Sequence, residues 1–296
     1  MASADTVAAS VPAALRPVQT PAQMARPALW KVSRGKITIY LFGTVHLLPS
    51  GLNWFAGPVA TAFTGSDELV TEVLEKPPEQ MRQIVSTYAT LPSGSAGKTL
   101  RTMLPPTNRR ALEKAMAAEG LPPGALDQFQ PWYAAVMLST LPLFHSGYDP
   151  AMGVDNQLSE KAKKLGYAHE ALETPEYQLG LFTSLPTAMQ IAYLHDVIAT
   201  LPKIQPELAA MIRAWKAGNA ARLAALMNED EDDPALRKLL LDDRNRNWAA
   251  WIDDRLAEPS KKPHTLFIAV GAGHLAGAGS LLEQLRAKGI VVSRVQ

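Results

Sequence analysis

The sequence of 296 residues contains no cysteine. This absence excludes a disulfide framework, thiolate-bound metals and a cysteine nucleophile, and it leaves the redox compartment undecided. The chain also lacks an excess of charge of one sign, because 29 basic and 28 acidic residues leave a formal net charge of +1. No overall field therefore attracts nucleic acid or an anionic membrane, and we expect the partner to be a peptide or a small molecule.

Long apolar runs are missing as well. Uncharged segments occur at 177–194 and 265–282, but Pro186 interrupts the first and four glycines interrupt the second, so no membrane span is expected. Residues 1–28 are rich in alanine and proline and show neither a helical apolar stripe nor the hydrophobic core of a signal peptide. We predict a disordered leader there. A mature exported chain would begin in this way, and so would a cytoplasmic protein with a loose tail.

What the sequence does contain is a set of short β-rich segments bounded by turn residues. They cover 29–42, which has the pattern of a hairpin, and 67–73, 167–173, 264–270 and 290–296. The run "TLFIAV" is apolar on both faces, as is typical of a parallel strand covered by helices on each side. We predict one α/β domain over residues 29–296, in which a central, mostly parallel sheet is flanked by helices and carries large helical insertions at about 76–165 and 174–262.

Two of these predicted strands end in the same motif. "LFGTVHLLPSG" at 41–51 and "LFIAVGAGHLAG" at 266–277 each place Gly-x-x-His directly after an apolar run. Loops beyond the carboxyl ends of parallel strands line the crevice where ligands bind, so His46 and His274 are expected at one rim of the sheet. A glycine at 43, 271 and 273 allows a sharp turn and a close approach of a ligand to the backbone.

Two acidic residues follow the other predicted strands, Glu72 and Glu173. Singly, each reads as a capping or solvated acid, but together with the histidines they place four titratable groups at one rim. Such a set suits a divalent metal such as zinc, manganese or cobalt, and it equally suits a metal-free general base with an orienting acid.

Two further residues are candidates on helical segments. Asp155 is predicted to cap the helix of "GVDNQLSEKAKKLG", or to lie beside the site and orient one of its groups. Arg244 falls on the apolar face of "LLLDDRNRNWAAWIDDRL", where an inward guanidinium needs a carboxylate or a substrate oxyanion. The alternative is an arginine that lies along the surface with its stem on Trp248.

The paired motifs, with "VTEV", "GVDNQLSEKAKKLG", "ALETPEYQLGLF", "WKAGN" and "LLLDDRNRNWAAWI", resemble the TraB/GumN family over nearly all of residues 28–296. That family is related to the Tiki and pheromone-shutdown proteins and, more remotely, to the erythromycin esterase and ChaN-like group. The resemblance implies an α/β fold with helical insertions and, from the Tiki branch, a metal-dependent peptidase that needs both histidines. It also favours a periplasmic or secreted location, since many bacterial members are exported.

Three hypotheses follow. In the first, a metal-dependent peptidase holds its cation with His46, Glu72 and His274, while Glu173 serves as general base or additional ligand and Arg244 stabilises an oxyanion or binds a substrate carboxylate. In the second, a metal-free, esterase-like hydrolase uses a histidine to activate water. In the third, the protein binds a peptide, haem or metal without turnover.

Overall fold

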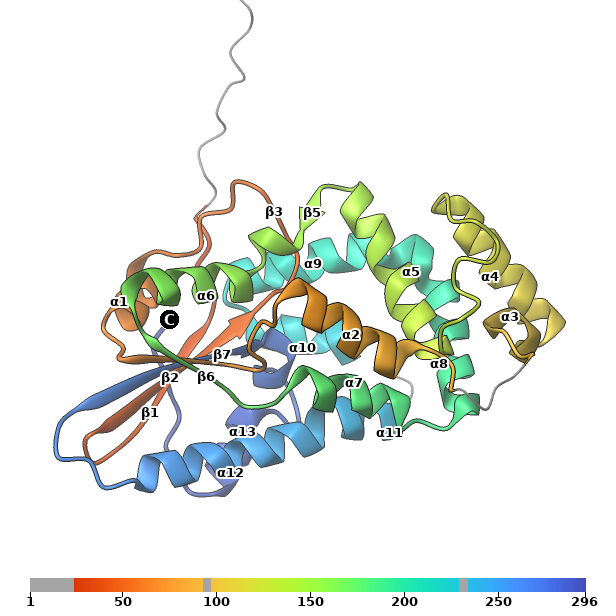
Figure 1. Ribbon diagram of the computed structural model, residues 1–296. Coiled ribbons are helices and arrows are strands. Elements are labelled where there is room, and N and C mark those ends of the chain that lie inside the picture. The colour runs from red at the N-terminus through yellow and green to blue at the C-terminus, as the bar shows by residue number, and fades with distance from the viewer. Residues whose placement is uncertain (1–23, 93–96, 229–233) are drawn as a thin grey trace, which may run out of the picture.

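The computed structural model describes residues 24–92, 97–228 and 234–296, and its main sheet has the strand order β6-β4-β7-β2-β1-β8 (Figure 1). These strands are β1 Leu29–Arg34, β2 Ile37–Thr44, β4 Glu68–Thr71, β6 Ala168–Ala171, β7 His264–Gly271 and β8 Ser293–Arg294. The pairs β6–β4, β4–β7 and β7–β2 are parallel, whereas β1 is antiparallel to both β2 and β8. The predicted α/β fold with a mostly parallel sheet is confirmed, and each predicted strand segment contributes to it.

Helices cover both faces of this sheet. Figure 1 shows α1 (Gly57–Thr64) and α6 (Val154–Leu165) above the sheet and α12 (Asp243–Ala257) and α13 (Leu281–Ala287) below it. The central strand β7 is buried on both faces over Leu266–Val270, because its alternate side chains enter two separate apolar clusters. The uninterrupted apolar run Leu266–Val270 thus reflects the helices on both faces of the sheet, as the sequence predicts.

The helical insertions build a lobe beside the sheet, at the right of Figure 1. Its core is an apolar cluster formed mainly by α4, α5 and α8. Helix α3 belongs to the same lobe, since its Leu100 is part of this cluster (Figure 1). The bounds are α2 Pro78–Ala89, α3 Leu100–Met103, α4 Pro106–Ala118, α5 Pro131–His145, α7 Pro175–Thr183, α8 Thr187–Thr200, α9 Ile204–Lys216, α10 Ala220–Asn228 and α11 Pro234–Arg237.

Short elements connect these parts. A two-stranded sheet joins β3 (Leu48–Pro49), just after β2, to β5 (Tyr148–Asp149). Single turns of 3₁₀-helix occur as η1 Pro150–Met152, η2 Leu201–Lys203 and η4 Ala272–Leu275, and a π-helical turn, η3 Lys238–Asp242, leads into α12.

Residues 24–28, which precede the predicted domain start at residue 29, contact the domain. Ala25 is buried, its N–H donates to the Asn53 carbonyl at 2.9 Å, and the Arg26 N–H donates to the Lys216 carbonyl at 2.8 Å. Residues 24–28 therefore pack against the domain and do not belong to a loose leader. The rest of the predicted leader, residues 1–23, lies outside the described residues.

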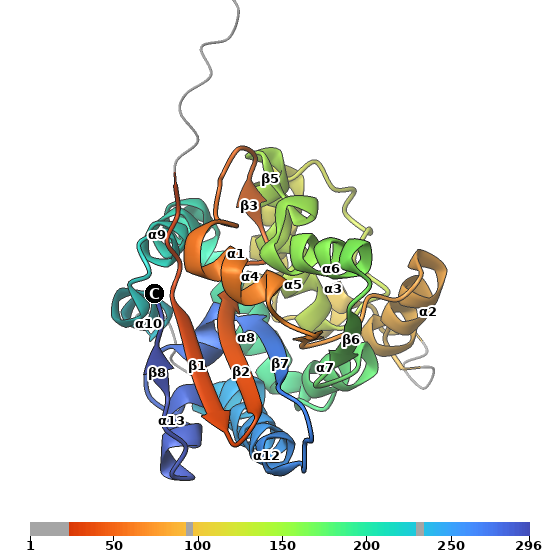
Figure 2. The same cartoon turned by 90° about the vertical axis from the view of Figure 1, so that its left-hand side faces the viewer.

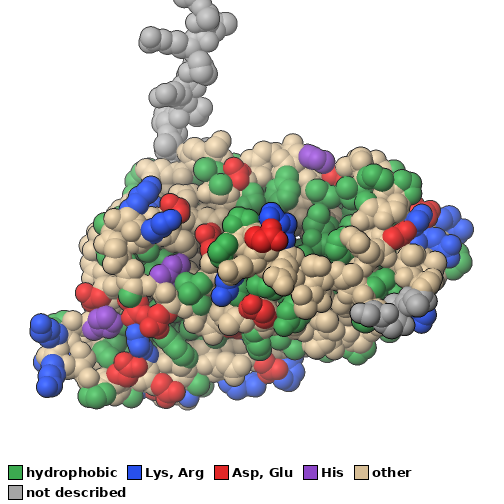
Figure 3. Space-filling model, in the orientation of Figure 1, with side chains coloured by type: hydrophobic (Ala, Val, Ile, Leu, Met, Phe, Trp, Pro, Cys, Tyr) green, Lys and Arg blue, Asp and Glu red, His purple; other side chains and the backbone are tan. Residues whose placement is uncertain are grey.

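The surface agrees with the even balance of charge. Acidic and basic side chains are interspersed on the face shown in Figure 3, with apolar side chains between them. Among the described residues, none of the helices has the length and apolar character that crossing a bilayer requires.

The carboxyl ends of the parallel strands form the part of the sheet where a ligand site is expected. Figure 2 shows β1, β2 and β7 side by side, with β6 and β8 toward the two margins. Because β2, β4, β6 and β7 are parallel, their carboxyl ends meet at the same edge. The residues that follow these four ends are the ones that the sequence singles out.

Candidate functional site

The two Gly-x-x-His motifs lie on adjacent strands. In the β2–β7 ladder, Gly43 pairs with Val270 and Thr44 with Gly271, so the motifs leave the sheet side by side. Gly43 is needed for packing, because a Cβ atom there would lie 3.0 Å from both Cα and Cβ of Ala272. The sequence predicts that Gly43 lets a ligand approach the backbone, but its surroundings indicate that it lets Ala272 pack closely.

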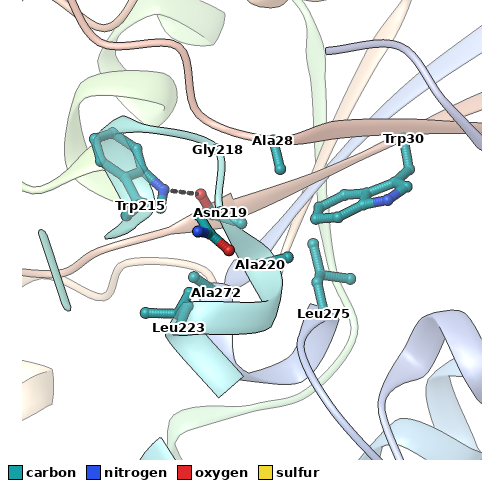
Figure 4. A pocket seen from close by; sticks show the side chains of 10 residues that line it. Ala28, Trp30, Trp215, Gly218, Asn219, Ala220, Leu223, Ala272 and Leu275 are labelled. Carbon is teal, nitrogen blue, oxygen red and sulfur yellow. Dashed lines mark hydrogen bonds between the residues drawn. The ribbon is translucent and has the colours of Figure 1, made fainter. Parts of the chain in front are cut away.

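A small cavity lies behind this contact. It has a volume of about 20 Å³ and is lined by Gly43, Ala272 and the ring of Trp215, whose Nε1 donates to the Gly43 carbonyl at 2.8 Å (Figure 4). The cavity is apolar apart from this bond and Asn219, and its volume is that of about one water molecule. The Trp215 bond holds the backbone of the first motif, and the cavity is too small for a substrate.

Three predicted residues converge over Gly271. A Cβ atom on this glycine would lie 3.2 Å from Glu72 Oε1, 3.7 Å from His274 Cδ2 and 3.9 Å from His46 Nε2. The Gly271 N–H donates to Glu72 Oε1 at 2.7 Å, which fixes the carboxylate in this position. The absence of a side chain at residue 271 therefore leaves a space that two imidazoles and one carboxylate surround.

His46 is the exposed member of this group. Its side chain is 71% exposed, and its Nδ1 lies 2.8 Å from Asp155 Oδ2. This hydrogen bond is the main reason that the pKa of His46 is raised to about 9, with the charges of Asp155 and Glu72 adding to it. Asp155 does not cap its helix, since the N-cap of α6 is Gly153, so the second predicted role, a residue beside the site, is the one that the geometry supports.

His274 is the buried member. Its Nδ1 lies 2.7 Å from Asn245 Oδ1, its Nε2 lies 3.1 Å from Arg244 Nη1, and its ring packs on Trp248 with the centroids 4.3 Å apart. Burial lowers the pKa of His274 to about 4, and the Arg244 charge adds to this effect while Glu72 opposes it. This imidazole is therefore neutral at physiological pH.

Arg244 points inward, as one of the two sequence interpretations requires. Its Nη2 bonds Glu72 Oε2 at 2.7 Å and Glu173 Oε2 at 2.8 Å, and its Nη1 donates to the Leu240 carbonyl at 2.9 Å. Leu240 belongs to the π-helical turn η3, so this local widening of the helix gives the guanidinium a backbone partner. Burial would lower the pKa of Arg244, but the two carboxylates outweigh it and raise the pKa.

Glu173 has little capacity left for other partners. Its Oε1 accepts from Arg244 Nε at 3.0 Å and from Trp248 Nε1 at 2.9 Å, and its Oε2 accepts from Arg244 Nη2 and from Gln178 Nε2 at 3.0 Å. The side chain is 6% exposed. Glu173 therefore holds Arg244, and its surroundings do not favour the predicted role of a general base.

Glu72 keeps one oxygen directed into the space over Gly271. Its Oε2 accepts from Arg244 and from Gln178 Nε2 at 2.9 Å, while Oε1 accepts only the Gly271 N–H among the bonds that the structure shows. Burial would raise the pKa of this carboxyl, but it is outweighed by the charge that His274 gains below its own pKa of about 4, by the charge of Arg244 and by the Gly271 bond, which together lower the pKa of Glu72 to about 2.

The donor set fits a divalent cation in two respects. Both histidines use Nδ1 for an oxygen partner, Asp155 or Asn245, which leaves Nε2 on the other side of each ring, as in many metal sites. His46 Nε2 and Glu72 Oε1 lie over Gly271, and His274 Nε2 lies 3.8 Å from Glu72 Oε1. In the arrangement described, however, Arg244 donates to His274 Nε2, and the described residues contain no group of three acidic or histidine side chains spaced as metal ligands. Binding of a cation by all three residues requires Arg244 to release His274.

Some residues of the site were not predicted from the sequence, and Gly273, like Gly43 and Glu173, has surroundings that indicate another role than the predicted one. Gln178 bridges the two glutamates and Asn245 holds His274, yet neither belongs to a recognisable motif. Gly273 leaves room for the side chain of Met227, so its surroundings point to packing and not to a ligand. A hollow of about 400 Å³ lies next to the site, between Glu173 and the ring of Trp251.

Comparison with known sequences gives one match. The sequence model described as the TraB/PrgY/gumN family matches residues 28–294. No match was found among the curated proteins or among the solved structures.

Proposed function

This chain belongs to the TraB/PrgY/gumN family, and from the geometry of its site we propose that it is a metal-dependent hydrolase that cleaves peptides. The observation that carries the proposal is the convergence of His46 Nε2, His274 and Glu72 Oε1 over Gly271. Two imidazoles and one carboxylate are a usual ligand set for a catalytic zinc ion, and they also suit manganese or cobalt.

The residues around the ligands support this role. Asp155 and Asn245 each occupy the Nδ1 side of one histidine, an arrangement that orients Nε2 and fixes the ring. Glu72 is ionised over the whole physiological range, because its pKa is lowered to about 2. We infer that His46 Nε2, His274 Nε2 and Glu72 Oε1 would hold the cation, whose binding would release the Nε2 proton that His46 carries at neutral pH.

A bound divalent cation would lower the pKa of a coordinated water from ~15.7 towards ~7 and polarise the scissile carbonyl. The protein would supply the remaining electrostatics. Arg244 carries a buried positive charge, and its five N–H groups are all directed to acceptors: Glu173, Glu72, the Leu240 carbonyl and His274 Nε2. Release of His274 on cation binding would free one Nη1 N–H, and we assign that group to stabilising an oxyanion or binding a substrate carboxylate. The hollow beside Glu173 has the size to receive a side chain of a peptide.

A second candidate, a metal-free hydrolase, is favoured by one observation. The Asp155–His46 pair leaves Nε2 of an exposed imidazole directed to the space over Gly271, which is the geometry of a histidine base held by an acid. Because the pKa of His46 is raised to about 9, this histidine is mostly protonated at neutral pH and accepts a proton only at alkaline pH. Activity of this kind is expected to rise with pH up to about 9 and to withstand chelation.

The first experiment is the measurement of metal content by mass spectrometry on protein purified without chelator and without affinity-tag histidines. The wild type is compared with His46→Ala, His274→Ala and the control His195→Ala, whose ring lies on an exposed part of α8. We expect near-stoichiometric metal in the wild type and the control and its loss in both site variants. Circular dichroism establishes that each variant is folded.

Activity then separates the hypotheses. Peptide mixtures are incubated with the metal-loaded and the chelated protein, and products are identified by mass spectrometry. Cleavage that chelation abolishes and the same metal restores supports the proposal. A folded wild type that takes up no zinc, manganese or cobalt refutes it. Cleavage in that metal-free protein selects the second candidate, whereas retention of peptide or haem without product selects a binding protein.

A further inference from the structure

The two histidines of the paired motifs differ in the partner of their Nδ1 atoms. His46 faces the carboxylate of Asp155, whereas His274 faces the side-chain amide of Asn245. An amide offers both an acceptor oxygen and donor N–H groups, so its effect on the imidazole depends on which end is turned toward the ring.

The surroundings of Asn245 decide its orientation. Its Nδ2 lies 2.9 Å from the carbonyl oxygen of Gly279, which can only accept a hydrogen bond. The NH₂ group must therefore face Gly279, and the amide oxygen must face His274. Asn245 is 2% exposed, so water does not compete for these bonds.

This orientation fixes the proton on the imidazole. The amide oxygen of Asn245, 2.7 Å away, can only accept, so Nδ1 of His274 must carry the hydrogen. On the opposite side of the ring, Arg244 Nη1 lies 3.1 Å from Nε2, and a guanidinium can only donate. Two independent neighbours thus require the same tautomer, with hydrogen on Nδ1 and the lone pair on Nε2.

We propose that Asn245 is a positioning residue that keeps His274 in the tautomer with hydrogen on Nδ1, so that the Nε2 lone pair accepts from Arg244 and is available to a cation once Arg244 releases it. In the alternative tautomer a hydrogen would occupy Nε2 and would exclude both the Arg244 bond and coordination of a cation. The inference deepens the proposed function, because it names the residue that makes His274 able to bind a metal. The tautomer itself does not depend on whether a metal is ever bound.

The experiment reads the tautomer directly. The metal-free protein is labelled with ¹⁵N, and long-range ¹H–¹⁵N spectra of the histidine rings are recorded for the wild type, Asn245→Leu, Asn245→Asp and the control Asn247→Leu. The signals of His274 are assigned as those lost in His274→Gln. Asn247 lies on the exposed side of α12, so the control reports what loss of an asparagine from this helix does by itself.

We expect Nδ1 of His274 to have the shift of a protonated nitrogen and Nε2 that of an unprotonated one, in the wild type and in the control. Asn245→Leu should replace this pattern by averaged or inverted shifts. Asn245→Asp should retain it, because a carboxylate oxygen also accepts from Nδ1. Hydrogen on Nε2 in the wild type overturns the proposal even if no variant folds, and so does an unchanged pattern in folded Asn245→Leu.

The affinity for zinc, measured by competition with a chromophoric chelator, gives a second readout. Loss of an orienting partner of this kind commonly lowers metal affinity about 10–100-fold, and this is the change expected for Asn245→Leu. An unchanged zinc affinity in that folded variant contradicts the positioning role. If the wild type binds no zinc, the proposed function fails, while the tautomer spectra still support or overturn the assignment to Asn245.

Discussion

The Nδ1 atom of His46 lies 2.8 Å from Oδ2 of Asp155, a residue 109 positions later in the chain. His46 leaves the end of β2, and Asp155 occupies the first turn of α6, so the pair joins the sheet to its covering helix. The Val154 N–H strengthens the same junction by donating to the Val45 carbonyl at 3.0 Å. The charge on the exposed histidine of the site is therefore set by a helix that the sequence places far away.

Replacement of Asp155 by asparagine should lower the pKa of His46 from about 9 toward 6.5, because the hydrogen bond to the carboxylate is the main cause of the raised value. The pair stabilises the fold fully below pH 6.5, and this contribution is lost as the pH rises through about 9. Titration of the His46 ring by NMR in the metal-free protein measures the shift. A pKa that stays near 9 in Asp155→Asn would show that another group holds the proton.

Gly271→Ala should block the site and leave the fold intact. The backbone at this position, with φ −48° and ψ 133°, accepts an alanine, so we expect the free energy of unfolding to change by less than ~1 kcal/mol. The added Cβ enters the space between the two histidines and Glu72, so the affinity for zinc should fall at least 10-fold. Gly124→Ala, whose Cβ would meet no atom closer than 3.6 Å, is the control for the substitution. Unchanged zinc binding in Gly271→Ala would place the cation elsewhere.

Gly43→Ala, in contrast to Gly271→Ala, should lower the free energy of unfolding. Its Cβ would lie 3.0 Å from two atoms of Ala272, one of them in the backbone, so the second motif must shift. Overpacking of this kind typically costs ~1–3 kcal/mol. Urea denaturation of Gly43→Ala and Gly124→Ala measures the difference, and equal midpoints for the two variants would refute the packing role assigned to Gly43.

Arg244→Ala should destabilise the protein strongly, because Glu72 and Glu173 would remain as buried carboxylates without their cationic partner. Breaking a buried ion pair on one side typically costs about 3–5 kcal/mol. Arg246, two residues later on the same helix, has a side chain that is 60% exposed and pairs with Asp243, so Arg246→Ala should cost less than about 1 kcal/mol. Thermal unfolding of both variants provides the comparison. A similar melting temperature for the two would mean that the buried carboxylates are protonated or hydrated in the variant.

The metal-free protein should lose stability as the pH falls from about 6.5 to about 4. Burial lowers the pKa of His274 to about 4, so in this range the unfolded chain binds a proton that the folded protein does not. The loss amounts to roughly 3 kcal/mol at most, since each unit of pKa shift corresponds to 1.36 kcal/mol. Urea denaturation at several pH values measures it, with His274→Gln as the reference. A slope against pH that is the same in both proteins would remove His274 as its cause.

Much of the site could be predicted because its signals are local in the sequence. An apolar run that ends in Gly-x-x-His marks a strand end, and parallel pairing then brings His46 and His274 to the same edge without further information. Glu72 and Glu173 follow from the same rule. The helical pattern leaves two alternatives for Arg244, a guanidinium that points inward or one that lies along the surface. Only the folded structure decides between them, because it brings Glu72 and Glu173 to Arg244 from the ends of two strands.

The partners of these groups could not be predicted, because they depend on how helices approach the sheet. Asp155 resembles a helix cap in the sequence, but Gly153 occupies the N-cap position and frees the carboxylate for His46. Gln178 and Asn245 are ordinary polar residues until α7 and α12 are docked. In the same way, Gly43 and Gly273 are explained by Ala272 and Met227, which lie near them only in the folded chain.

The parallel pairing of β2 with β7 has a consequence for the time at which the site can form. The two strands come from opposite ends of the described chain, so the second histidine leaves the ribosome long after the first. A nascent chain that has exposed His46, Glu72 and Asp155 still lacks His274 and its support from α12. A chain that terminates before β7 therefore lacks both Gly271 and His274, and it cannot form the space that His46, Glu72 and His274 surround.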